Sequence, residues 1–95
     1  MDISIVVAVY NVEKQLRRCL NSIFSQHLCG TFEVIAVNDA STDSSARTLE
    51  TNLQREPRLA VISRQVNKGL SITRATAMKA ALGEYIMHVD SDDWP

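Results

Sequence analysis

The chain is poor in the residues that define several specialised classes of protein. Its 95 residues include only two cysteines, three glycines and two prolines, and aromatic residues make up 5%. Cys19 and Cys29 cannot build a disulfide framework and lack the spacing of a metal cluster, so we expect reduced thiols in an intracellular protein. A formal net charge of −1 without a basic run gives no support for nucleic-acid binding.

Long apolar segments are also lacking. The stretch from Ile3 to Val9 is too short for the hydrophobic region of a signal peptide with normal flanks, and nothing approaches the length of a transmembrane span. No internal repeat or low-complexity linker occurs. Because the chain is 45% hydrophobic and 22% charged, we expect residues 1–95 to form a single globular domain.

What is present is a regular alternation of strand and helix patterns. β-Branched apolar runs predict buried strands at residues 3–9, 32–37, 59–63 and 84–89. Helical spacing predicts a helix over 12–26, a second capped by Asp43 or Ser44, and a third capped by Ser71 and stopped by Gly83. The inward stripes of the second and third helices are expected at Ala46, Leu49 and Leu53, and at Ala75, Met78 and Leu82. This order predicts a Rossmann-like three-layer α/β/α fold with a mainly parallel sheet.

Polar residues follow three of the predicted strands. They are Tyr10-Asn11, Asn38-Asp39 and Asp90-Ser91-Asp92-Asp93. In an open parallel sheet, ligands bind beyond the carboxyl ends of the strands, so these clusters are expected to converge on one site. The three close carboxylates would repel one another, and a hard cation such as Mg²⁺ or Mn²⁺ would remove that conflict. A solvated acidic turn is the alternative.

Four motifs give the whole chain a family resemblance. They are Val7-Ala8-Val9-Tyr10-Asn11; Val37-Asn38-Asp39-Ala40-Ser41-Thr42-Asp43; Asn67-Lys68-Gly69-Leu70-Ser71 with Arg74; and Gly83-Glu84-Tyr85 through Asp93. In this order they resemble the N-terminal, nucleotide-sugar-binding part of a family 2 glycosyltransferase with the GT-A fold. The departures are mild: Ala8, Asn38 and Ala40 stand where the family often has Pro, Asp and Gly, and Thr73 and Ala75 flank Arg74 where Ala and Asn are common.

The resemblance implies a set of donor-binding residues. Ala8, Val9 and Tyr10 would line the base and ribose pocket, and Asp39 would accept a hydrogen bond from the base edge. Asp92 would ligate the metal directly, while Asp90 would contact the ribose or reach the metal through water. The remaining donor-binding residues implied by the motifs are Lys68, Gly69, Arg74 and Ser91.

Several of these residues have a simpler alternative role. Asp39 can bond the backbone of the Ser41-Thr42 turn, and Lys68 can be an ordinary solvated cation. Gly69 is expected to serve the loop backbone rather than chemistry. Arg74 is expected in the first turn of its helix, where a cation needs an anionic neighbour or ligand. Asp93 can cap a helix.

The resemblance further implies a metal-dependent transfer with inversion. A UDP-sugar is the default donor, with GDP- and dTDP-sugars as alternatives, and Mn²⁺ or Mg²⁺ is the expected cofactor. The acceptor would be a saccharide or a lipid-linked saccharide in polysaccharide biosynthesis, at a cytoplasmic location that extends to the inner face of the membrane. The general base and the acceptor-binding half are expected beyond Pro95, so residues 1–95 would bind nucleotide without turnover. An exposed sheet edge would favour a homodimer.

Two other classes compete with this interpretation. In a haloacid-dehalogenase-like phosphatase, Asp90 would be the nucleophile and Asp92 the acid/base, but Trp94 stands where that motif has Thr or Val. A non-catalytic nucleotide-binding domain of the same fold is the second alternative. Dinucleotide binding is not supported, because no Gly-x-Gly-x-x-Gly follows the first strand.

Overall fold

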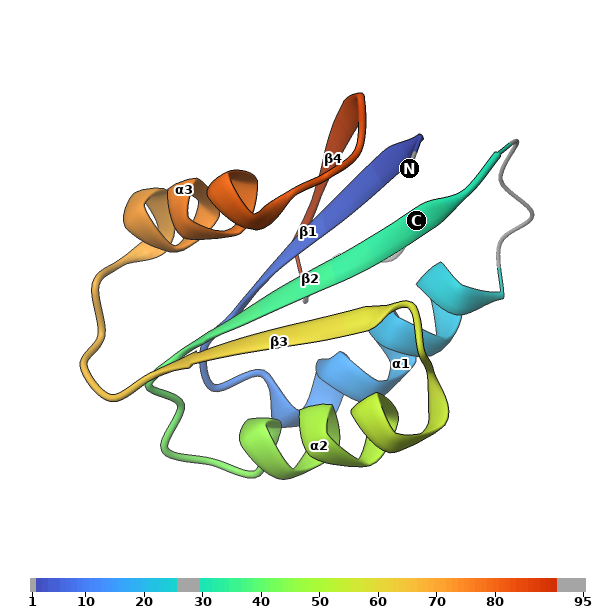
Figure 1. Ribbon diagram of the computed structural model, residues 1–95. Helices are drawn as coiled ribbons and strands as arrows, with labels where there is room; N and C mark the ends of the chain where they lie inside the picture. Colours follow the sequence, from blue (N-terminus) through green and yellow to red (C-terminus); the bar gives the residue numbers. More distant parts are fainter. Residues whose placement is uncertain (1, 26–29, 91–95) are drawn as a thin grey trace.

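The computed structural model describes residues 2–25 and 30–90. Within these residues strands and helices alternate in the predicted order (Figure 1). The elements are β1 (Ile3–Val9), α1 (Glu13–Phe24), β2 (Phe32–Asp39), α2 (Ser45–Arg55), β3 (Leu59–Arg64), α3 (Leu70–Ala80) and β4 (Tyr85–Asp90). The predicted boundaries agree with these to within two residues. No helix in the described part of the chain is long and apolar enough to cross a membrane.

The four strands form one parallel sheet in the order β3-β2-β1-β4. α1 and α2 cover one face, and α3 covers the other (Figure 1). The chain winds outward from β1 to β3, and α3 then returns it across the sheet to β4 on the far side of β1. The predicted three-layer α/β/α arrangement is therefore confirmed, and β1 is the point where the strand order switches direction.

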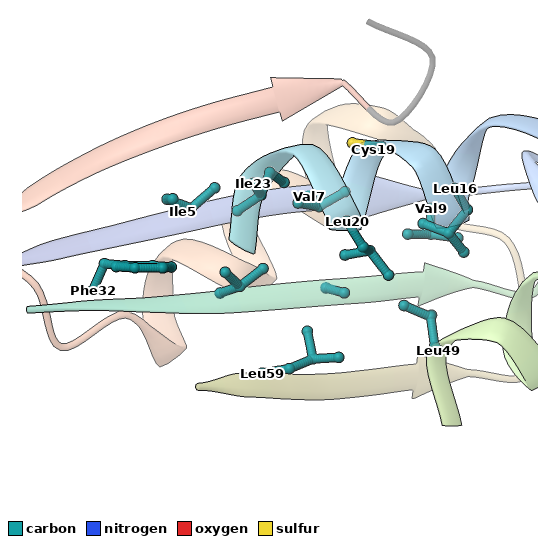
Figure 2. Close-up of a cluster of buried hydrophobic side chains, with 12 residues drawn as sticks. Ile5, Val7, Val9, Leu16, Cys19, Leu20, Ile23, Phe32, Leu49 and Leu59 are labelled. Carbon is teal, nitrogen blue, oxygen red and sulfur yellow. The ribbon is translucent and has the colours of Figure 1, made fainter. Parts of the chain in front are cut away.

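The larger core lies between the sheet and the first two helices. Alternate residues of β1, namely Ile5, Val7 and Val9, point to this side, because side chains alternate between the faces of a strand. Figure 2 shows them packed against Leu16, Cys19, Leu20 and Ile23 of α1, Leu49 of α2, and Phe32 and Leu59. Leu16, Leu20 and Ile23 form the buried stripe of α1, and Cys19 is a small core residue beside it.

The predicted stripe of α2 is only partly right. Leu49 is buried together with Ser45, but Ala46 is exposed and Leu53 is 43% exposed. Because α2 contacts mainly β3, the edge strand, the sheet covers only a narrow part of the helix surface. Ser45 takes the buried position beside Leu49, where an apolar pattern would not place it.

The predicted stripe of α3 is wrong. Ala77 is buried against Val6, Ile35 and Val37, and Thr73 is buried as well, whereas Ala75, Met78 and Leu82 are exposed. Small side chains at Thr73, Ala77 and Ala81 recur every fourth residue and allow the helix to lie close to the sheet. The larger apolar residues therefore point away from it.

The predicted ends of α3 also need correction. The helix begins after Gly69 without a side-chain cap from Ser71, and it ends at Ala80, before Gly83. Gly83 does not adopt a left-handed conformation. Instead it lies against β1, where a Cβ atom would come within 2.6 Å of the Ser4 backbone nitrogen. Gly83 therefore allows two backbone segments to lie close together, and it does not terminate the helix.

Candidate functional site

The carboxyl ends of the parallel strands lie together on one side of the sheet (Figure 1). We call this side, where the strands end, the carboxyl edge; it is distinct from the edge strands β3 and β4. The loops there span residues 10–12 after β1, 40–44 after β2 and 65–69 after β3. Asp90, the last residue of β4, pairs in register with Ala8 of β1. The predicted site residues from the first, second and fourth strands are thus brought to the same edge, as expected.

Side-chain hydrogen bonds tie the first two loops together. The backbone N–H of Thr42 donates to Asn11 Oδ1 at 2.7 Å, and the Thr42 hydroxyl donates to the same oxygen at 3.3 Å. In return, the N–H of Asn11 donates to Ser41 Oγ, and the N–H of Val12 donates to Ser45 Oγ, both at 3.1 Å. The backbone next to Tyr10 therefore has a fixed position relative to the second loop.

The second loop begins with a turn closed by Asn38. This side chain is buried, and its Oδ1 accepts a hydrogen bond from the N–H of Ser41 at 3.1 Å. Ala40, between them, has a φ of 62°, in the left-handed region that side chains disfavour. Asn38 thus makes the contact with the turn, and the alternative role of Asp39 as the residue that bonds this turn is wrong.

Asp39 instead holds the third loop. Its buried carboxylate accepts hydrogen bonds from the N–H groups of Lys68 and Gly69, each at 2.9 Å, and its carbonyl accepts one from Asn67 Nδ2 at 3.4 Å. Gly69 has a φ of 89°, so it serves the loop backbone as predicted. The end of β2 is therefore connected to the start of α3.

The surroundings of Asp39 favour its ionised form. Burial by itself would raise the pKa of this carboxyl, but the hydrogen bonds from Lys68 and Gly69, the nearby Thr73 hydroxyl and the charge of Arg64 together hold the pKa below its ordinary value. Thr73 Oγ1 is buried and close enough to contribute, although it meets the geometry of a hydrogen bond to no described residue. Asp39 is thus a buried anion at the carboxyl edge.

Arg64 is a site residue that the sequence analysis missed. It is the last residue of β3, its guanidinium lies 4.0 Å from the Asp39 carboxylate, and its side chain is 15% exposed. The carbonyl of Ile72 and the hydroxyl of Thr76 accept hydrogen bonds from it. The signal was available: a cation directly after a predicted strand occupies the same kind of position as Tyr10 and Asp39.

The two predicted cations of the site differ in their placement. The Lys68 side chain is exposed beside the loop that Asp39 holds. Arg74 is half-buried and lies in the second turn of α3, which begins at Leu70, so its predicted position in the first turn is wrong. Arg74 makes an interaction in the structure, and the expected anionic neighbour stays a prediction.

The predicted metal ligands fall largely outside the described residues. Asp90 is placed by the backbone of β4 at the carboxyl edge, and Ser91, Asp92 and Asp93 lie beyond the described part of the chain. Among residues 2–25 and 30–90, no cluster of three or more acidic, histidine or cysteine side chains forms a metal site. The carboxylate-rich donor set of residues 90–93 fits a hard divalent cation.

The fold and the carboxyl edge define the class of open parallel α/β proteins, in which ligands bind where the strand order switches. The comparisons with known proteins narrow this class. The sequence model of the family "Glycosyl transferase family 2" matches residues 4–95, and the chain belongs to that family. Its sheet and helices have the GT-A fold of these enzymes.

Three proteins illustrate the similarity. Glycosyltransferase GlyA of Streptococcus pneumoniae is 42% identical over 92 residues, which are 97% of this chain and 13% of GlyA. The structure of S. aureus TarS 1-349 in complex with UDP-GlcNAc has a TM-score of 0.89 at 38% identity and covers 99% of this chain and 27% of that one. The mannosyltransferase PcManGT from Pyrobaculum calidifontis, in complex with GDP-Man and Mn²⁺, shares the fold, with a TM-score of 0.90 at 24% identity over 97% of this chain and 28% of its own. The chain thus spans between about an eighth and somewhat over a quarter of these relatives.

Proposed function

We propose that this chain binds the nucleotide-sugar donor of a metal-dependent glycosyltransferase. The observation that carries the proposal is the similarity to TarS, which has been seen with UDP-GlcNAc and aligns over 99% of this chain. The whole protein would transfer the sugar to an acceptor hydroxyl with inversion, and a UDP-sugar is the donor that we favour. The family match leaves the phosphatase alternative without support.

The base and ribose are assigned to the carboxyl edge. Ala8 and Val9 end β1 next to Asp90, and Tyr10, the first residue of the following loop, is half-exposed. Asp39 would accept a hydrogen bond from the base with the lone pairs that Lys68 and Gly69 leave unused, since a carboxylate offers about four acceptor positions. Lys68, Gly69 and Arg74 would face the diphosphate, and Ser91 would contribute within the Asp-x-Asp motif.

Asp92 would ligate Mn²⁺ or Mg²⁺ directly, with Asp90 next to it. When bound, the metal neutralises the charge that develops on the departing nucleoside diphosphate. The general base, a saccharide or lipid-linked acceptor and a cytoplasmic location at the membrane's inner face belong to the whole protein and are proposed with it.

Thermal unfolding with UDP, GDP, dTDP or CDP, each with and without Mn²⁺, tests this proposal. Ligand at a hundredfold excess over its dissociation constant adds about 2.7 kcal/mol to the free energy of unfolding, which gives a clear rise in Tm. We expect a Mn²⁺-dependent rise with UDP that Asp92→Ala abolishes. A rise that is the same in Asp92→Ala, or no rise with any nucleotide, would contradict the assignment.

A non-catalytic nucleotide-binding protein of the same fold is the second candidate. It would give the same nucleotide binding but no sugar transfer by the whole protein, so a transfer assay separates the two.

We also propose that copies of the chain associate through the outer edge of β4. Tyr85, Ile86 and Met87 are exposed there, with Tyr85 at 72%. Unpaired strand edges with apolar side chains favour pairing with another chain. Sedimentation of a Tyr85→Lys variant as a smaller species than the unchanged protein would support this contact, and equal sedimentation would oppose it.

A further inference from the structure

We infer that Asn11 is a positioning residue for the nucleoside. Its side chain fastens the loop after β1 to the loop after β2, and it thereby fixes the backbone on which the nucleoside would lie. The inference rests on the proposed function and deepens it, because it assigns a task to a residue that would not itself touch the reacting atoms.

The first reason is the place of Asn11 in the chain. It directly follows Tyr10, the last of the residues assigned to the base and ribose, and only Val12 separates it from α1. Its φ of 51° lies in the left-handed region, where Asn is tolerated better than most side chains. β1 ends at Val9, and the left-handed conformation of Asn11 turns the chain between Tyr10 and α1.

The second reason is that Asn11 bonds in both directions. Its Oδ1 accepts from the N–H and the hydroxyl of Thr42, while its own N–H donates to Ser41 Oγ. These contacts span 30 and 31 positions in the sequence, so they join loops that no local turn would hold together. We call this set of contacts the Asn11 clasp.

The third reason is the rigidity of the partner loop. Ser41 is bonded to the buried Asn38, and the N–H of Ser45 donates to Asp43 Oδ1 at 2.9 Å. The loop after β2 is therefore held by contacts with β2 and α2 that do not involve Asn11. A loop fastened to such a support keeps one conformation, which reduces the ordering cost when a ligand binds.

Three substitutions at Asn11 separate the contribution of its side-chain oxygen from that of its left-handed backbone conformation. Asn11→Gly keeps the left-handed conformation but removes the amide oxygen. Asn11→Asp keeps an acceptor at the same distance from the backbone, and Asn11→Ala removes the acceptor and disfavours the conformation. Asn52→Ala is a matched control, because it removes an asparagine bond of 2.8 Å to the Thr48 carbonyl within α2, away from the carboxyl edge.

Two measurements on the full chain are needed. Hydrogen exchange without ligand reports on the clasp: Asn11→Gly should expose the Thr42 amide and leave the Ser41 amide, bonded to Asn38, protected. Calorimetric titration with uridine and with UDP reports on binding. We expect Asn11→Gly to raise the dissociation constant of both ligands by about tenfold, since the two hydrogen bonds from Thr42 to the Asn11 side chain no longer order the loop. Asn11→Ala should raise it further.

The conservative variant distinguishes positioning from a general loss of stability. Asn11→Asp should retain exchange protection at Thr42 and restore uridine affinity to within about twofold of the unchanged protein. Asn52→Ala should leave both dissociation constants unchanged, because its lost hydrogen bond lies within α2 and not at the carboxyl edge. Uridine is the deciding ligand for Asn11→Asp, because it carries no phosphate that an added charge would repel.

The outcomes separate this inference from the function on which it rests. If the unchanged protein binds UDP and Asn11→Gly exposes Thr42 yet binds uridine equally well, the inference is wrong and the proposed function stands. If Asn52→Ala weakens binding as much as Asn11→Gly, the effect is one of stability and the inference is again wrong. If the unchanged protein binds no nucleotide, the proposed function fails first.

Discussion

Ala40, at the carboxyl edge, has a backbone conformation that alanine rarely adopts. Ala40 has a φ of 62°, a conformation that disfavours any residue with a Cβ by about 1–2 kcal/mol. It stands where similar sequences often have Gly, which the sequence alone marked as a mild departure. The structure explains why Gly suits this position, because the turn between Asn38 and Ser41 places residue 40 in the left-handed conformation.

At the residue scale we therefore predict that Ala40→Gly stabilises the protein. Relief of the left-handed strain should exceed the added entropy of the unfolded chain, for a net gain of up to about 1 kcal/mol and a rise in Tm of a few degrees. The control is Ala75→Gly, at an exposed helical position, which should lower stability by about 1 kcal/mol. A similar loss of Tm in both variants would show that Ala40 is not strained.

Residue roles were harder to predict than residue membership in the site. The motifs placed Asp39 at the site, but nothing in the sequence indicated that Lys68 and Gly69, about 30 positions away, would donate to it. Asn11 belonged to a motif but had no predicted contact, and Arg64 was not predicted as a site residue at all. Such contacts depend on how loops meet in space, and this is set by the sheet register rather than by local spacing.

At the scale of elements, hydrogen bonds hold the connection between α3 and β4 against β1 and β2, at the end of the sheet opposite the carboxyl edge. Ser4 Oγ donates to Glu33 Oε2 at 2.6 Å and accepts from the N–H of Gly83 at 2.8 Å. The same Glu33 oxygen accepts from the N–H of Leu82 at 2.7 Å. The connection from α3 to β4 is thus bonded to two strands.

This geometry predicts that Gly83→Ala is strongly destabilising. The new Cβ would lie 2.6 Å from the Ser4 nitrogen and 2.7 Å from the Ile3 carbonyl carbon, and these backbone atoms cannot move without disturbing the sheet. We expect a loss of about 2–3 kcal/mol, measured as a drop in the urea midpoint. Adding Ser4→Ala should not restore stability, because the backbone contacts remain. A wild-type midpoint in Gly83→Ala would contradict the close approach.

Strands were easier to predict than helix faces. Runs such as Ile3–Val9 are apolar throughout, as buried parallel strands must be, and their order fixed the fold class. The face of α3 could not be predicted, because its buried positions are the small residues Thr73 and Ala77 while larger apolar side chains remain exposed. The hydrophobic pattern therefore predicted the wrong buried face for α3, because close packing against the sheet favours small residues there over large apolar ones.

At the scale of the whole molecule, three carboxylates link stability to pH. The pKa of Asp39 is lowered by the bonds and charge described above, that of Asp2 chiefly by the hydrogen bond from the N–H of Thr31, and that of Glu56 chiefly by its bond to Arg58. A carboxylate with a lower pKa in the folded state stabilises the fold above its unfolded pKa, and this stabilisation is lost as the pH falls toward the folded value.

We therefore predict a nearly constant urea midpoint between about pH 5.5 and pH 7 and a decline below about pH 5, as the pH approaches the ordinary values of 3.8 for Asp and 4.5 for Glu. Asp39→Asn should make the decline shallower, because the buried titrating group is gone. A midpoint that rises on acidification would reverse the sign and contradict the ionised state of Asp39.

The central claim is that the carboxyl edge binds a nucleotide, and an NMR titration of the ¹⁵N-labelled protein with UDP and Mg²⁺ tests it most directly. The account predicts amide shifts at Tyr10–Val12, Asp39–Thr42 and Lys68–Gly69, with none at Leu82–Gly83 or Glu56–Arg58 on the opposite edge. Shifts centred on the opposite edge, or no shift at saturating UDP, would contradict it.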